Sequence, residues 1–150
     1  MEIIGYYSSE NKEHWLSEIK KSQWSAGQFL HKLLSDDTFK DTVGESSDVL
    51  MLTEGDELIS FCTLAEKDDI QPTELTPWIG FVYTFPQYRG HRYSEKLLSY
   101  AEEKAKEKFF DKIHISTNHI GLYEKFGYEL YGIMKDIDGE DSRVYIKELK

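Results

Sequence analysis

The hydrophobic residues of this chain fall into short blocks, and runs of β-branched and aromatic residues bounded by polar turns predict strands. The predicted strands are residues 3–7, 49–53, 58–65, 78–84, 113–117, 128–134 and 143–149. Residues 49–53 and 58–65 are separated only by residues 54–57, which include a glycine, and this hairpin-length turn predicts an antiparallel pair. The last two strands are joined through Asp138 and Gly139.

Between the strands, apolar residues recur every three or four positions, which is the spacing of amphipathic helices. Helices are predicted around residues 15–19, 25–34, 94–109 and 120–126, the last one stopped by Gly127. Ser25 and Gln28 have the spacing of a capping box at the start of the second helix. The apolar face of the second helix consists of Phe29, Leu30, Leu33 and Leu34, and that of the third of Leu97, Leu98, Ala101, Ala105 and Phe109. This alternation, without a repeat or a linker, predicts one mixed α/β domain over residues 1–150.

The composition is that of a folded protein, because 39% of the residues are hydrophobic and 14% are aromatic. No apolar run approaches the roughly 20 residues of a membrane-spanning helix, and the N-terminus lacks the pattern of a secretory signal. Cys62 is the single cysteine, which excludes an internal disulfide or a cysteine-based metal cluster. No metal-ligand spacing is present among His14, His31, His91, His114 and His119. We therefore expect a soluble, cytoplasmic protein without a metal and without membrane association.

The negative charge is concentrated in the first half of the chain. Residues 1–76 hold 6 Lys or Arg against 16 Asp or Glu, a net charge of −10, whereas residues 77–150 hold 12 of each kind. Such a field repels phosphates, so nucleic acid is not expected as a partner. The excess acid either attracts a cationic partner or only keeps the protein soluble, and the composition leaves both interpretations open.

A local basic segment, residues 87–108, holds six basic and four acidic side chains. It begins with Arg89, Gly90, His91 and Arg92, directly before the long predicted helix. Free backbone N–H groups at a helix N-terminus bind anions, helped by the positive end of the helix dipole, and glycine allows close approach. The segment predicts a site for a ligand with several phosphates, although a solvated basic turn has the same sequence features.

Residues 78–131 resemble the core of the GNAT superfamily of N-acetyltransferases in two separate segments. The acetyl-coenzyme A loop of that family reads Gln or Arg, two residues, Gly, one residue, then Gly or Ala, and Gln87, Gly90 and Arg92 occupy these positions. Further along, ISTNHIGLYEKFGYELYG resembles the family's fifth strand, an Asn, and a short helix that carries a Tyr. The resemblance implies the GNAT fold, a mixed, mostly antiparallel sheet with helices on both faces. In that fold the fourth and fifth strands are splayed to form the cofactor slot.

The resemblance also implies roles for individual residues, with residues 78–131 as the core that binds acetyl-coenzyme A. Tyr123 corresponds to the catalytic acid that reprotonates the departing thiolate, and Asn118 to the residue that hydrogen-bonds the cofactor arm. The main chain of Thr84 and Phe85 would pair with the pantetheine arm like an added strand. The pyrophosphate would bind the backbone amides of Arg89, Gly90, His91, Arg92 and Tyr93, with both arginine side chains near the phosphate charge.

Three features depart from the family pattern. Arg92 replaces a small residue, and Asn118 precedes Tyr123 by five residues, which is fewer than in the common pattern. The predicted fourth strand holds no carboxylate or histidine, the usual candidates for the base that deprotonates the amine. Glu74, His119 or a chain of water molecules are the alternatives for this base. Without the resemblance, Tyr123 has the pattern of an ordinary core aromatic.

Two functions fit these observations. The first is an acetyl-coenzyme A-dependent N-acetyltransferase in which a primary amine attacks the thioester directly in a ternary complex. Its acceptor is a small cationic amine or a protein amino group, and homodimer formation is left open. The alternative is a non-catalytic module that binds or senses acyl-coenzyme A. Cys62 stands among apolar neighbours on a predicted strand and is interpreted as a packed thiol, not a nucleophile.

Overall fold

The central sheet contains the predicted hairpin, formed by strands β2 (Asp48–Glu54) and β3 (Glu57–Ala65), which pair antiparallel. Glu54 lies opposite Glu57, so the turn between the strands has only two residues. The first of them, Gly55, takes a left-handed conformation (φ +59°), which glycine adopts without steric cost. The hairpin prediction is therefore confirmed, with a tighter turn than the sequence pattern indicated.

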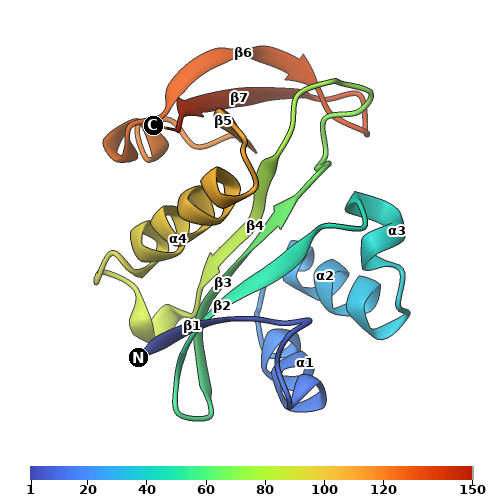
Figure 1. Ribbon diagram of the computed structural model, residues 1–150, viewed down its shortest axis with the longest axis vertical. Helices are drawn as coiled ribbons and strands as arrows, with labels where there is room; N and C mark the ends of the chain where they lie inside the picture. Colours follow the sequence, from blue (N-terminus) through green and yellow to red (C-terminus); the bar gives the residue numbers. More distant parts are fainter. Residues whose placement is uncertain (150) are drawn as a thin grey trace.

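In the computed structural model, which describes residues 1–149, seven strands form one sheet in the order β1-β2-β3-β4-β5-β7-β6. The other strands are β1 (Glu2–Gly5), β4 (Trp78–Thr84), β5 (Lys112–Thr117), β6 (Glu129–Lys135) and β7 (Asp141–Glu148). Neighbouring strands are antiparallel except β4 and β5, which are parallel. The prediction of a mixed, mostly antiparallel sheet is confirmed (Figure 1).

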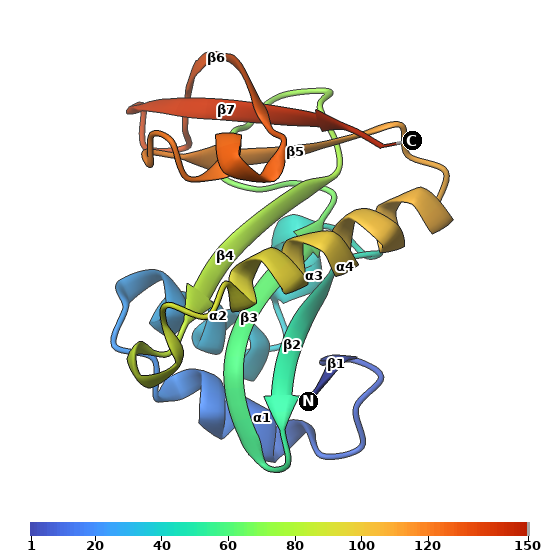
Figure 2. The same ribbon diagram turned by 90° about the vertical axis from the view of Figure 1, so that its left-hand side faces the viewer.

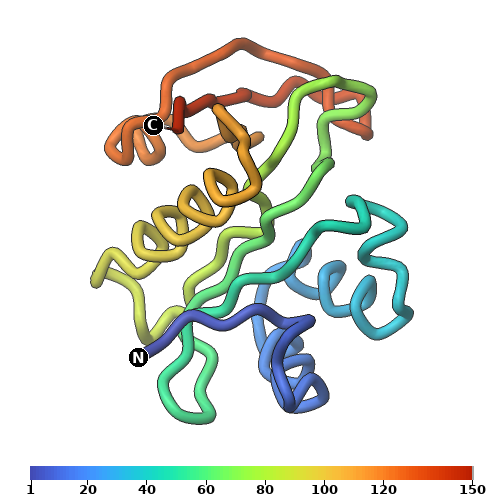
Figure 3. The backbone as a smooth tube through the Cα atoms, in the orientation of Figure 1, coloured from blue at the N-terminus to red at the C-terminus, as the bar shows by residue number. Residues whose placement is uncertain are grey.

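Strands β4 and β5 stay paired over only two positions. Trp78 lies opposite His114 and Ile79 opposite Ile115, and beyond these pairs the strands separate. Figures 1 and 2 show β5, β6 and β7 as a group turned away from β1 to β4, and Figure 3 shows the same divergence in the backbone. The predicted splay is confirmed: among the described residues, β4 has no strand partner on its β5 side from Gly80 onward.

Helices cover both faces of the sheet, as predicted (Figure 1). One face is covered by α1 (Lys12–Lys20), α2 (Ser25–Ser35) and α3 (Phe39–Val43), and the other by α4 (Tyr93–Glu107). Two 3₁₀ helices, η1 (Pro86–Tyr88) and η2 (Tyr123–Phe126), follow β4 and β5. Helix α3 was not predicted, because five residues are too few to show helical periodicity.

The sheet divides the hydrophobic core into two main parts. Phe61 of β3 packs with residues of α1 and α2 on one side, whereas Cys62 packs with Leu97 of α4 on the other. This alternation follows from the two-residue period of a strand, whose successive side chains point to opposite faces. We call the two sides the α1–α3 side and the α4 side.

The prediction of a capping box at the start of α2 is wrong. The helix begins at Ser25 itself, with Trp24 at the N-cap position and without a side-chain cap. Gln28 instead donates through Nε2 to the carbonyl oxygens of Lys20 and Ser22, both at 2.7 Å. The side chain that was expected to cap α2 therefore ties it to the end of α1.

Two aromatic residues predicted for the core lie on the surface instead. Phe29 on α2 is 49% exposed, and Phe109 is 93% exposed. Helix α4 ends at Glu107, and Phe109 takes a left-handed conformation (φ +69°) that redirects the chain before β5. The helix predicted over residues 120–126 is reduced to η2, which ends at Gly127 (φ +91°) as expected.

Candidate active site

The slot between β4 and β5 begins beside an irregularity in β4. Phe61 lies opposite Tyr83 and Thr63 opposite Gly80, so β4 carries one more residue than β3 between these two pairs. Phe81, in this bulge, has φ +49°, a conformation that non-glycine residues rarely adopt. A bulge takes backbone N–H groups out of the regular ladder, and strained backbone concentrates at functional sites. No sequence pattern predicts a phenylalanine with a left-handed backbone conformation, so the bulge was not predicted.

The last residues of β4 present one edge of their backbone to the slot. The Phe85 N–H donates to the Ile59 carbonyl of β3 at 3.1 Å. Because backbone groups alternate in direction along a strand, the N–H and C=O of Thr84 point away from β3. The Thr84 carbonyl accepts a hydrogen bond from Arg89 Nε at 2.9 Å. Thr84 is thus placed to pair with an extended ligand, once the Arg89 side chain moves aside.

The basic turn leads directly into α4. Gly90 has φ +90°, and a Cβ at this position would meet nothing within 4 Å. Arg92 is the N-cap of α4 in a left-handed conformation (φ +59°), and no side chain caps the helix. The Arg92 guanidinium pairs with Glu95 at 2.8 Å. Exposed N–H groups of the first turn are therefore available to an anion, although one of the two arginines expected near it is engaged by a carboxylate.

Tyr123 lies on the α4 side of the sheet and is 5% exposed. Its ring packs against those of Tyr128 and Tyr145, with centroid distances of 6.2 and 6.4 Å. Burial, with a smaller contribution from Cys62, raises the pKa of Tyr123 to about 12. Within residues 1–149 its hydroxyl group makes no hydrogen bond, so a neutral O–H is free to donate. Asn118 is exposed just beyond the end of β5.

Cys62 is fully buried between β2 and β4. Burial raises the pKa of its thiol to about 12. A thiol that stays protonated is a poor nucleophile. The interpretation of Cys62 as a packed thiol agrees with this environment.

The two side chains proposed as bases lie away from the bulge. Glu74 is exposed in the loop before β4, and His119 is exposed beyond β5. A Cβ on Gly80, next to the bulge, would instead overlap Oδ1 of Asp68. Burial and the neighbouring Asp69 charge raise the pKa of Asp68 to about 7. No local sequence pattern indicates this contact of Asp68 with β4, because it depends on the tertiary fold.

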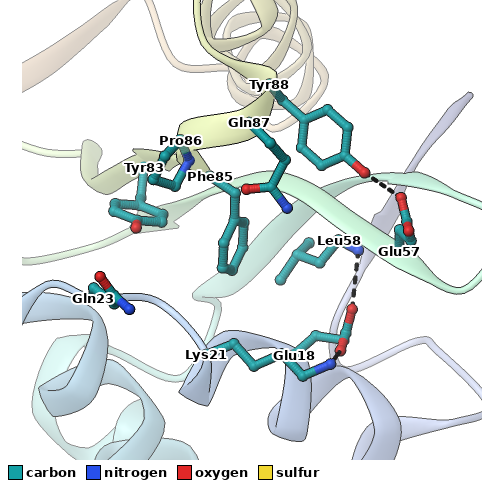
Figure 4. A pocket seen from close by; sticks show the side chains of 10 residues that line it. All are labelled: Glu18, Lys21, Gln23, Glu57, Leu58, Tyr83, Phe85, Pro86, Gln87 and Tyr88. Atoms are coloured by element: carbon teal, nitrogen blue, oxygen red, sulfur yellow. Dashed lines mark hydrogen bonds and ion pairs between the residues drawn. The ribbon is translucent and has the colours of Figure 1, made fainter.

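A cavity of about 360 Å³ lies on the α1–α3 side, between α1 and the end of β4 (Figure 4). It is lined by Glu18, Lys21, Gln23, Glu57, Leu58, Tyr83, Phe85, Pro86, Gln87 and Tyr88. Tyr88 donates its hydroxyl hydrogen to Glu57, and Glu18 accepts from the Leu58 N–H at 3.4 Å and pairs with Lys21 at 2.5 Å. The cavity combines aromatic walls with two carboxylates from segments far apart in the sequence, so periodicity could not predict it.

The model of the acetyltransferase (GNAT) family matches residues 12–128. The chain belongs to the GNAT family. Both the predicted family and the predicted enzyme class, an acetyltransferase, are thereby confirmed. A search of curated protein sequences found no match.

Solved structures share the GNAT fold over nearly the full chain. A GNAT acetyltransferase from Desulfovibrio desulfuricans is 12% identical, with a TM-score of 0.70 and 99% of each chain covered. The aminoglycoside 6′-N-acetyltransferase from Enterococcus faecium is 13% identical, with a TM-score of 0.71 and coverage of 100% of this chain and 98% of that chain. A GNAT acetyltransferase from Elizabethkingia anophelis with acetyl-coenzyme A bound is 17% identical, with a TM-score of 0.67 and coverage of 99% and 97%. At these identities the likeness shows the fold.

No helix within residues 1–149 is long and apolar enough to cross a membrane. Over the same residues, no group of three or more His, Cys, Asp or Glu side chains could hold a metal ion. The roles of the individual cofactor and catalytic residues stay predictions.

The Gly90 turn can be tested with a matched pair of glycines. Gly90→Ala and Gly139→Ala both place a Cβ in open space at positive φ (+90° and +78°). Each is expected to lower the free energy of unfolding by about 1–2 kcal/mol through backbone strain. Only Gly90→Ala is expected to weaken acetyl-coenzyme A binding, about tenfold by calorimetry, because the turn shapes the anion site. Equal binding by the two variants would remove Gly90 from that site.

Proposed function

We propose that this GNAT protein transfers the acetyl group of acetyl-coenzyme A to a primary amine by direct attack in a ternary complex. The observation that carries the proposal is the slot between β4 and β5, which starts beside the bulge at Phe81 and leads toward the uncapped start of α4. Direct attack is favoured over a covalent intermediate because the one cysteine, Cys62, is buried and protonated.

Acetyl-coenzyme A would lie with its pyrophosphate on the first turn of α4 and its pantetheine arm along the free edge of β4. The backbone amides of residues 89–93 and the Arg89 side chain would hold the phosphates. The outward-facing backbone of Thr84 would pair with an amide of the arm as an added strand does. The same pairing predicted for Phe85 is not available, because the Phe85 N–H points toward β3 and bonds the Ile59 carbonyl. Asn118, beyond the end of β5, would contact the arm from the other wall of the slot. The acetyl-coenzyme A bound to the Elizabethkingia anophelis protein supports this choice of donor.

Tyr123 would act on the sulfur of the leaving group. With a pKa of about 12 the phenol stays protonated at neutral pH, and its O–H has no competing partner among residues 1–149. An ordinary thiol has a pKa of about 8.5, so full proton transfer from this phenol to a thiolate is uphill by about 5 kcal/mol. Tyr123 therefore stabilises the developing thiolate as a hydrogen-bond donor. A backbone N–H released by the bulge would stabilise the oxyanion of the tetrahedral intermediate.

The acceptor that fits best is a small amine with a positive charge. Residues 1–76, which include helices α1, α2 and α3 on the α1–α3 side of the sheet, carry a net charge of −10. Trp24 stacks on Tyr83 with ring centroids 5.4 Å apart, and Phe81 lies edge-on to Trp24 at 6.5 Å. Aromatic faces beside carboxylates favour cations over neutral or anionic molecules. The likeness in fold to an aminoglycoside 6′-N-acetyltransferase also supports a small cationic amine as the acceptor.

The test is release of free thiol from acetyl-coenzyme A with a panel of amino sugars, polyamines, amino acids and lysine-containing peptides. We expect acceptor-dependent release with one of the small cationic classes, and mass spectrometry should show one acetyl group added to the amine. Reaction with peptides alone would instead identify a protein amino group as the acceptor. Acetyl-coenzyme A binding without release for any acceptor would favour the non-catalytic module.

A further inference from the structure

The α1–α3 side of the sheet carries polar side chains at the point where β4 and β5 separate. Cys62 on β3 and Ile79 on β4 belong to the core on the α4 side. Since successive side chains point to opposite faces, Thr63 and Gly80 face the α1–α3 side. A Cβ on Gly80 would overlap Asp68 Oδ1 and lie 3.1 Å from Thr63 Oγ1. Oδ1 of Asp68 and Oγ1 of Thr63 therefore both lie close to the Gly80 backbone, beside the bulge.

Three buried polar atoms on β3, on β5 and in the loop before β4 have no hydrogen-bond partner. Within residues 1–149, Thr63 Oγ1, Asp69 Oδ1 and His114 Nε2 are buried and make no hydrogen bond. Thr63 is 1% exposed and His114 is 3% exposed. Nδ1 of His114 is 3.0 Å from the Pro77 carbonyl oxygen and donates to it, which leaves the Nε2 lone pair free. Buried polar atoms are normally paired with a hydrogen-bond partner. These unpaired acceptors are therefore suited to a hydrogen-bond donor on a bound ligand. The Asp68 side chain is partly exposed to such a ligand.

No positive side chain offsets the acid at this place. Among residues 1–149, neither Asp68 nor Asp69 takes part in an ion pair. Burial, and after it the neighbouring Asp69 charge, raise the pKa of Asp68, and burial lowers the pKa of His114 on β5, which favours its neutral form. β3 places the Thr63 hydroxyl, and β4 the Gly80 backbone, next to Asp68. The β6–β7 hairpin contributes a backbone N–H to the Asp69 carbonyl at 2.8 Å.

We propose that Asp68 is the proton acceptor for the amine in acetyl transfer, with Asp69 as a positioning residue beside it. The inference rests on the proposed function. It places the base on the α1–α3 side of the sheet and the sulfur donor, Tyr123, on the α4 side. The amine would thus arrive from one side of the slot, and the thiolate would leave on the other.

The acceptor binds as an ammonium ion, and two protons leave its nitrogen during acetyl transfer. The ammonium group of the acceptor binds the Asp68 carboxylate and gives it one proton. The free amine attacks the thioester carbonyl carbon, forming an N–C bond while the π pair moves to oxygen. Collapse of the intermediate re-forms C=O and breaks C–S, and the thiolate leaves toward the Tyr123 O–H. The nitrogen loses a second proton as the amide forms, the thiolate takes up one, and one proton is released overall.

The experiment compares Asp68→Asn with Asp69→Asn in the full chain, using the best amine acceptor. For the wild type, kcat is expected to rise about tenfold per pH unit below about pH 7 and then level off, because the base must be ionised. Asp68→Asn is expected to lose about 10²–10³-fold in kcat at pH 7, together with this acidic limb. Asp69→Asn should retain the acidic limb but move it to lower pH, because a neighbouring negative charge is gone.

A second substrate separates a proton acceptor from a structural role. A fluorinated analogue of the same acceptor, whose amine is mainly uncharged at neutral pH, does not need the base. Asp68→Asn should therefore lose less than about tenfold with the analogue, while circular dichroism and acetyl-coenzyme A binding match the wild type. Equal losses with both amines, or an acidic limb that survives in Asp68→Asn, would overturn the role of Asp68. A wild-type chain inactive with every amine would overturn the proposed function itself.

Discussion

Tyr123→Phe is expected to lower kcat about 100-fold and to leave the KM for acetyl-coenzyme A within about threefold. A loss of this size corresponds to about 2.7 kcal/mol of transition-state stabilisation, within the range of positioned proton donors. The reason is the state of the hydroxyl, which belongs to a side chain that is only 5% exposed, stays neutral and has no hydrogen-bond partner among residues 1–149. Phenylalanine keeps the ring that packs against Tyr128 and Tyr145, so the fold should be retained. Steady-state thiol release at saturating amine measures the effect.

Tyr128→Phe is the matched control for Tyr123→Phe. Tyr128 is 2% exposed in the same core, but its hydroxyl already donates to Glu102 at 2.8 Å. Removing that hydroxyl should reduce stability by about 1–3 kcal/mol, because Glu102 loses a buried partner, and should leave kcat nearly unchanged. Unchanged turnover in Tyr123→Phe would show that another group assists the leaving thiolate. Equal losses in both variants would indicate a packing effect.

Trp78→Ala is expected to lower the free energy of unfolding by about 3–5 kcal/mol, the range found when a buried Trp or Phe is truncated. Trp78 is fully buried at the first of the two positions where β4 and β5 pair. Its ring lies 5.3 Å from that of His114, and its Nε1 donates to the Leu75 carbonyl at 2.7 Å. The substitution therefore leaves a cavity between the two parts of the sheet and releases the loop before β4. Urea denaturation followed by fluorescence and circular dichroism measures the change.

Two further variants calibrate the Trp78 result. Trp78→Phe retains most of the volume but not the indole N–H, so it should fall between the wild type and Trp78→Ala. Phe109→Ala removes an aromatic ring that is 93% exposed and should change the free energy of unfolding by less than about 0.5 kcal/mol. A loss below about 1 kcal/mol for Trp78→Ala would mean that the two parts of the sheet are joined mainly by other contacts. The loop that carries Asp68 would then be anchored elsewhere.

The parts of the fold that depend on nearby residues could be predicted from the sequence. Residues 49–65 alternate and turn as a hairpin because strand periodicity and a turn glycine act over a few positions. The basic turn and α4 were likewise predicted, since a helix start and its stripe of small and apolar residues are local features. Predictions failed at the ends of helices. Gln28 bonds the end of α1 instead of capping α2, and Phe109 is exposed because α4 ends two residues before it.

The candidate site divides in the same way. The sequence alone determined the family resemblance, the basic turn at Gly90 that is predicted to bind an anion, and the position of Tyr123, because each lies in a continuous motif. Only the tertiary structure decided that the Tyr123 side chain is buried with its hydroxyl unpartnered among residues 1–149, that Phe81 has a left-handed backbone, and that Asp68 lies over Gly80. Burial, strain and the pKa of a carboxylate depend on atoms from strands far apart in the chain. Hydrophobic periodicity has no information about those atoms, because it reports only which face of an element is covered.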